Sequence, residues 1–187
     1  IISSIFSIYA FDALKKELSN ISELRFLFSE YNKSDVNLLG NDNERKFRNQ
    51  LDCQQIAIEC AKWIEEKVFI KKSNHIGQSL THIKNPELDI AIQGSSNFNM
   101  EGLGLADSTH YQMNTKFDSK TGASELLQWF NTIWEDENSV EDIKKEILTH
   151  LSYIYSEKSS SQFYYYTIYS LFKEFIEDIQ EDKIIKT

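Results

Sequence analysis

The order of the apolar segments constrains the fold of this chain more than any other feature. Residues 24–28 form a short apolar run typical of a strand, and the apolar spacing over 43–67 predicts a long helix. Residues 68–71 then form a second apolar run of strand type. A strand, helix and strand in this order are typical of a layered α/β fold with a mixed sheet.

The other segments continue this alternation before the chain becomes wholly helical. The single proline, Pro86, lies between two strand patterns, where a turn tolerates it. We further expect an amphipathic helix over 9–20, a polar loop over 31–42, strands over 76–83, 88–93 and 111–117, and helices over 122–135, 139–156 and 161–180. The sequence therefore predicts an α/β domain over 1–120 and a C-terminal helical extension over 121–187 packed on it.

Charge is distributed unevenly along the chain. The 187 residues carry a formal net charge of −9, whereas a plain nucleic-acid binder is usually basic. Acidic residues are denser after residue 135 than before it, and 14 of the 20 Lys and Arg residues lie before it. We therefore expect any phosphate-binding surface to lie in the first two thirds of the chain.

The two cysteines, Cys53 and Cys60, lie seven residues apart in a helical pattern. This spacing predicts two buried thiols on one helix face, and it matches neither a zinc site nor a disulfide scaffold. We expect no metal and no cofactor. The apolar runs are too short to span a bilayer, so we expect a cytoplasmic protein without a membrane partner.

A polar turn follows the apolar run 90–92. Gly94, Ser95, Ser96 and Asn97 place small hydroxyl and amide side chains at the end of a predicted strand. Such side chains can donate hydrogen bonds to phosphate oxygens, and glycine lets the backbone approach closely. The same residue types also form ordinary turns, so phosphate binding and strand capping both stay open.

The wider segment 91–105 resembles the second half of the phospholipase D-type signature. The resemblance is to the version of that domain found in front of bacterial superfamily-two helicases. Four flanking segments resemble the same domain: 6–11, 58–64, 126–135 and 163–172. The resemblance implies a phospholipase D-like mixed sheet flanked by helices, and a helicase motor later in a longer parent chain. The strand-like start at Ile1 agrees with a piece of a longer protein.

The resemblance also implies a chemistry, which is metal-independent phosphodiester cleavage. In that family a histidine attacks phosphorus, a second histidine protonates the leaving oxygen, and lysine and asparagine neutralise phosphoryl charge. One motif in each chain supplies half a site. A homodimer is therefore expected, with DNA as a partner reached through the parent protein.

A literal search for the missing half of the signature finds His82 and Lys84, followed by Asp89. This placement predicts an active, metal-independent phosphodiesterase or nuclease with His82 as nucleophile in a dimeric site. The distance from Lys84 to Gly94 is two residues shorter than in the family pattern. Strand geometry also argues against it. A tight turn at 86–87 pairs Ser79 with Gly94 and directs residues 82 and 84 to the opposite face from residues 77 and 79.

The family's own spacing supports a different alignment. Residues 74–83 align without a gap, which places Gly77 at the catalytic histidine and Ser79 at the lysine. Gln112 likewise stands where the family often has an acid. The favoured hypothesis is therefore a catalytically degenerate domain that acts in dimerisation or DNA positioning, and the active His82 enzyme is the alternative.

Overall fold

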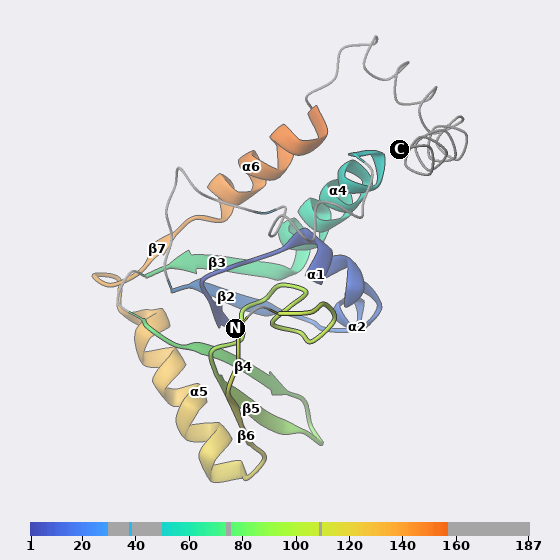
Figure 1. The fold of residues 1–187 in the computed structure, drawn as a ribbon. Helices are drawn as coiled ribbons and strands as arrows, with labels where there is room; N and C mark the ends of the chain where they lie inside the picture. The colour runs from blue at the N-terminus through green and yellow to red at the C-terminus, as the bar shows by residue number, and fades with distance from the viewer. Residues whose placement is uncertain (30–37, 39–49, 74–75, 109, 157–187) are drawn as a thin grey trace, which may run out of the picture.

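The chain forms a mixed α/β structure built on one seven-stranded sheet, seen in a computed structural model that describes residues 1–29, 38, 50–73, 76–108 and 110–156 (Figure 1). The strand order is β6-β5-β4-β1-β2-β3-β7. The strands are β1 (Ile2–Ser3), β2 (Leu24–Phe28), β3 (Val68–Lys72), β4 (Ser79–Lys84), β5 (Asp89–Gly94), β6 (Asn114–Phe117) and β7 (Glu141–Asp142). The helices described are α1 (Ile8–Ala13), α2 (Lys15–Ser19), α4 (Gln50–Lys67), α5 (Lys120–Glu135) and α6 (Lys144–Ser156). The predicted α/β class with a mixed sheet is confirmed.

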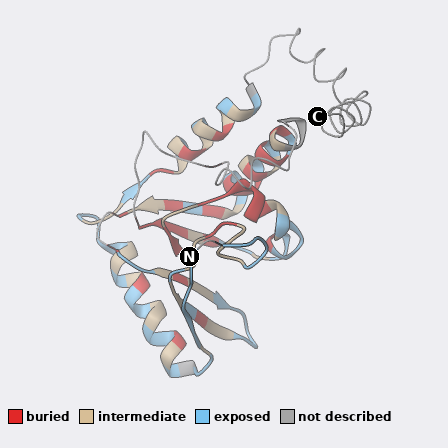
Figure 2. Ribbon diagram, in the orientation of Figure 1, coloured by how far each residue is buried: buried red, intermediate tan, exposed pale blue. Residues whose placement is uncertain are grey.

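One half of the sheet is parallel and contains most of the core. β2 lies between β1 and β3 and runs parallel to both. Apolar side chains of β2 and β3, including Phe26 and Ile70, pack with α1, α4 and α6 on one face. Figure 2 shows the buried residues gathered in this half of the molecule. The predicted strand, helix and strand over 24–71 thus forms the centre of the fold.

The other half is antiparallel and is covered by α5. β4 pairs with β1 and β5, and β6 forms the outer edge beyond β5. Leu80 and Ala91 point toward α5, where they pack with Phe130 and with Ile2 and Leu27 of the parallel half. Since side chains alternate along a strand, the odd-numbered residues of β4 lie on the opposite face.

Two predicted helices differ from the observed elements, and the strands expected over 76–83 and 111–117 begin only at Ser79 and Asn114. The helix expected over 9–20 is divided at Leu14 into α1 and α2, and the bend brings Leu18 into the core with Leu14 packed beside it. The helix expected over 139–156 begins only at Lys144. The preceding residues form β7 because the free edge of β3 offers backbone partners there, and Lys72 pairs with Glu141 at 3.0 Å.

Several predictions concern residues outside the described part of the chain. These are the polar loop over 31–42 apart from Leu38, the start of the helix over 43–67, and the helix over 161–180. The boundary between the α/β domain and the helical extension at residue 120 stays a prediction. Within the described residues, α5 covers the sheet directly and α6 packs beside α4.

Candidate functional site: a polar edge of the sheet

Four strand ends meet at one edge of the sheet and place polar residues side by side. β1 ends at Ser3, β4 begins at Ser79, β5 ends at Gly94, and β6 begins at Asn114. The register pairs Ser79 with Gly94 and Gly94 with Asn114. The turn over 94–97 therefore lies beside the end of β1, although almost a hundred residues separate them in the sequence.

Asn97 ties this turn to the first strand. Its Oδ1 accepts hydrogen bonds from Ser4 N at 3.0 Å and Ser4 Oγ at 2.9 Å, and Ser3 Oγ, which donates its proton to Ile5 O, lies 3.1 Å away. The Ser79 hydroxyl approaches the same oxygen at 3.4 Å. A backbone N–H can only donate, so the atom that faces Ser4 N is the amide oxygen. The amide Nδ2 then has no hydrogen-bond partner among the described residues.

A second set of contacts ties the turn to β6. Asn114 accepts from Ser96 N at 3.3 Å and donates through Nδ2 to Ser96 Oγ at 2.6 Å. The Ser96 hydroxyl can then donate its proton to Gln112 Oε1 at 2.7 Å. Ser95 Oγ accepts from Met113 N at 3.2 Å, which leaves its own O–H proton for solvent or a ligand. The donors that this edge can offer therefore include the Ser95 hydroxyl and the Asn97 amide, beside amide protons of Gln112 and Asn114.

Gly94 is required by this packing. A Cβ there would overlap Met113 O and Asn114 Oδ1 and would lie 2.8 Å from Asn114 Cα. Gly77, just before β4, is different, because nothing lies within 4 Å of its Cβ position. The structure thus places Gly77 in open space near the start of β4 and Ser79 against Asn97.

The predicted hairpin register is confirmed. Ser79 pairs with Gly94, His82 with Ala91 and Ile83 with Ile90. His82 and Lys84 therefore share the α5 side of the sheet with Leu80, and Ser79 lies on the other side. Three residues of extended strand also separate His82 from Ser79, which is about 10 Å.

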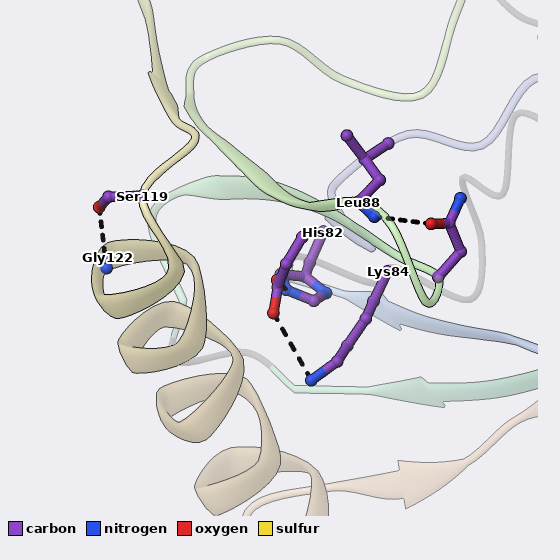
Figure 3. Close-up of polar contacts among 7 residues, drawn as sticks. His82, Lys84, Leu88, Ser119 and Gly122 are labelled. Atoms are coloured by element: carbon purple, nitrogen blue, oxygen red, sulfur yellow. Dashed lines mark hydrogen bonds and ion pairs between the residues drawn. The ribbon is translucent and has the colours of Figure 1, made fainter.

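His82, Lys84 and Asp89 form a separate cluster near the hairpin turn. His82 Nε2 lies 2.8 Å from Asp89 Oδ1, and Lys84 Nζ lies 3.5 Å from Asp89 Oδ2. Figure 3 shows His82 and Lys84 pointing to the same side of the hairpin. The His82 side chain is only 10% exposed and that of Asp89 only 16%. This carboxylate orients the imidazole within the fold rather than toward the polar edge.

His150 and Cys60 lie away from the polar edge, on α6 and α4. His150 is on α6, where its ring packs 6.5 Å from that of Tyr153. His75 is outside the described residues. Burial raises the pKa of the Cys60 thiol, which keeps it protonated and unreactive. The described residues contain no group of three or more His, Cys, Asp or Glu side chains placed to hold a metal ion.

Sequence reasoning identified the turn but missed its partners on β1. Ser3 and Ser4 follow the apolar pair 1–2, and this change from apolar to small polar residues was the available signal. Asn114 was likewise assigned only to a strand.

None of the described helices has the length and apolar character of a membrane span.

No protein-family model, curated protein or solved structure matches this chain.

Proposed function

We propose that this chain is a phospholipase D-like domain whose own catalytic half-site is degenerate. In this proposal it serves a helicase-type parent protein by dimerising or by positioning DNA. One observation carries the proposal: the residue that meets Asn97 at the polar edge is Ser79, where the family resemblance expects a lysine. The histidine and lysine that remain in the hairpin lie on the other face.

The chemistry available at the edge supports binding rather than cleavage. Phosphoryl transfer through a covalent intermediate needs a nucleophile activated by its surroundings, and the family chemistry needs cations to balance phosphoryl charge. Gly77 offers no side chain, and Ser79 offers a neutral hydroxyl. Hydroxyl and amide donors can still bind a phosphate oxygen without transferring it. The Ser95 hydroxyl and the Asn97 amide are the groups that would do so.

The His82 cluster supports a structural assignment for the hairpin. Asp89 bridges His82 and Lys84 across neighbouring strands, so the three side chains form a cross-strand contact. A histidine nucleophile must reach the phosphorus atom. Here a neighbouring carboxylate holds the nearly buried ring, and α5 covers the same face of the sheet.

Activity measurements separate the two hypotheses. Phosphodiesterase activity is measured in EDTA on single-stranded DNA, double-stranded DNA and a small chromogenic diester, with wild type, His82→Ala and Gly77→Ala side by side. The degenerate domain predicts no turnover in any of them, with circular dichroism showing that each is folded. Metal-independent turnover that disappears only in His82→Ala would refute the proposal and establish the His82 enzyme.

Binding is tested separately, by NMR titration with inorganic phosphate and with a short DNA duplex. We expect chemical-shift changes at Ser95 and Asn97. Asn97→Asp should abolish them, because a carboxylate keeps the acceptor of the turn but repels an anion. Absence of any shift at the turn in wild type would leave it a strand cap and refute the phosphate-binding part of the proposal.

A further inference from the structure

We propose that the outer edge of residues 111–117, which comprise β6 and the three residues before it, pairs with the same edge of a second copy of this chain, so that one sheet runs through a dimer. The two strands would be antiparallel, related by a two-fold axis at Asn114. This deepens the dimerisation part of the proposed function by naming the interface. It rests on the geometry of the edge and not on the fate of the catalytic residues.

The outer edge of β6 is open in the described part of the chain. β6 ends the sheet order, and its only strand neighbour is β5. Residues 111–116 are all exposed, including Tyr111, which is fully exposed, and Met113, which is 80% exposed. An exposed edge with large apolar side chains is a template for pairing with another strand, and proteins usually protect such edges.

The backbone alternation shows which groups this edge offers. Ser95 donates its N–H to Met113 O at 3.3 Å, so Met113 belongs to a hydrogen-bonded pair with β5. In an antiparallel ladder such pairs alternate with pairs that make no mutual bonds. Thr115 and Phe117 therefore also bond inward. The N–H and C=O groups of Asn114 and Lys116 point away from the sheet and can bond a further strand.

A two-fold axis at Asn114 makes this edge complementary to itself. Asn114 then pairs with its own copy, and Lys116 faces Gln112 of the other copy. On the face of the sheet that α5 covers, Met113 of one copy would lie opposite Thr115 of the other, and Tyr111 would lie opposite Phe117 of the other. Aromatic pairs across strands stabilise a sheet. The apolar side chains thus meet on one face, and the polar ones meet on the other.

Charge favours a second copy as the occupant of this edge. The whole chain carries a net charge of −9, so most of its surfaces would repel one another. Residues 111–117 contain no acidic residue and one base, Lys116. The next charge, Asp118, would lie opposite His110 of the other copy. The edge is therefore a place where two acidic chains can approach without like-charge contact.

The two-fold arrangement also leaves room for both copies of α5 and places the two polar edges on either side of the axis. A two-fold axis perpendicular to the sheet keeps α5 of both copies on the same face. The two β5 strands would be three strand spacings apart, about 14 Å, which exceeds the 8–10 Å at which helices pack. Since Gly94 pairs with Asn114, the two turns over 94–97 would lie on either side of the axis.

The first test is sedimentation equilibrium of the full chain, comparing wild type with Lys116→Pro and Lys116→Ala. Proline removes the outward N–H of residue 116 but no bond to β5, and proline is tolerated at such edge positions. Each dimer loses two hydrogen bonds, so we expect Lys116→Pro to weaken dimerisation about 30-fold, which is about 2 kcal/mol. Lys116→Ala keeps the N–H and should dimerise within a few-fold of wild type.

The second test fixes the register by disulfide cross-linking. The double variant Met113→Cys with Thr115→Cys places thiols opposite each other in the dimer, at a separation that a disulfide can span. In the single variant Met113→Cys the new thiol faces Thr115 of the other copy, and in Thr115→Cys it faces Met113, so neither can form a disulfide across the axis. We expect oxidation to give covalent dimers of the double variant only. Wild type controls for the native Cys53 and Cys60.

The outcomes decide the proposal independently of the proposed function. A chain that stays monomeric, or a dimer that Lys116→Pro leaves intact and the double variant does not cross-link, would overturn the β6 interface. Phosphate binding or inactivity at the polar edge would be unaffected by that result. Conversely, metal-independent cleavage through His82 would refute the degenerate site and leave the β6 dimer standing.

Discussion

Removal of the Asn97 side chain should loosen the joint between the polar turn and the first strand. In the native structure its Oδ1 accepts two hydrogen bonds from Ser4, at 3.0 Å from the backbone N and 2.9 Å from Oγ, while Ser3 Oγ lies 3.1 Å away and Ser79 Oγ 3.4 Å away. Asn97→Ala deletes this acceptor and leaves the donors without their common partner. The single Ser3 hydroxyl proton is donated to Ile5 O at 2.7 Å, and this bond survives the substitution.

The magnitude follows from the number of good bonds. A typical intramolecular hydrogen bond contributes about 0.5–1.5 kcal/mol net, and the partly exposed hydroxyls can turn to water. The two bonds from Ser4 therefore predict a loss of about 1–3 kcal/mol in the free energy of unfolding. For a chain of this size that lowers the thermal midpoint by about 2–10 °C.

Asn97→Asp is the matched control. A carboxylate has the same shape and keeps acceptor oxygens for the same serine donors, and charged acceptors form stronger hydrogen bonds. We expect its stability at pH 7 to stay within about 1 kcal/mol of wild type.

Urea unfolding followed by circular dichroism measures both variants. The expected result for Asn97→Ala is a lower midpoint with an unchanged slope, which reports a change in stability rather than in compactness. A loss below about 0.5 kcal/mol for Asn97→Ala, or equal losses for the two variants, would refute the argument that the acceptor oxygen holds this turn.

Three further predictions follow from the glycines, the thiols and one surface carboxylate. Gly94→Ala should cost about 1–3 kcal/mol because the new methyl group meets the backbone of β6, whereas Gly77→Ala, with open space around it, should stay within about 0.5 kcal/mol in urea unfolding. Cys60 should resist a thiol reagent in the native protein, since burial raises its pKa, while half-buried Cys53 reacts faster; equal native rates would contradict this. A lysine hydrogen bond lowers the pKa of Glu59, so its ionised form stabilises the fold above the unfolded pKa of about 4.3 and loses that effect as pH falls through the folded value. Glu59→Gln should therefore cost less than about 1 kcal/mol at pH 7 and nothing at pH 3, and a cost that persists at pH 3 would argue against the ion pair.

Local patterns predicted the hairpin closely because its geometry is local. A tight turn at Pro86 and the two-residue alternation of strands set the pairing of Ser79 with Gly94, and the structure has that pairing. The same reasoning separated His82 from the polar turn. The contact between His82 and Asp89 was not predicted as a pair, because it depends on how two side chains meet across the strands.

Elements that depend on distant partners were predicted less well. The short strand β7 exists because β3 has a free edge, and nothing in residues 141–142 alone indicates a strand. The break at Leu14 similarly depends on the core against which α1 and α2 pack. The structure describes neither the predicted helix over 161–180 nor the start of the helix over 43–67, so these stay predictions.

The amino-acid sequence by itself determined the α/β class, the central strand, helix and strand, and the faces on which Ser79 and His82 lie. These follow from hydrophobic periodicity and strand parity, which are properties of neighbouring residues. Only the tertiary structure decided that β1 lies between β4 and β2, and so brought Ser3 and Ser4 to the oxygen of Asn97. Strand order depends on packing among segments far apart in the chain, so local sequence patterns do not show it. At the polar edge this order decides which donors and acceptors bond to one another and which are left for a ligand.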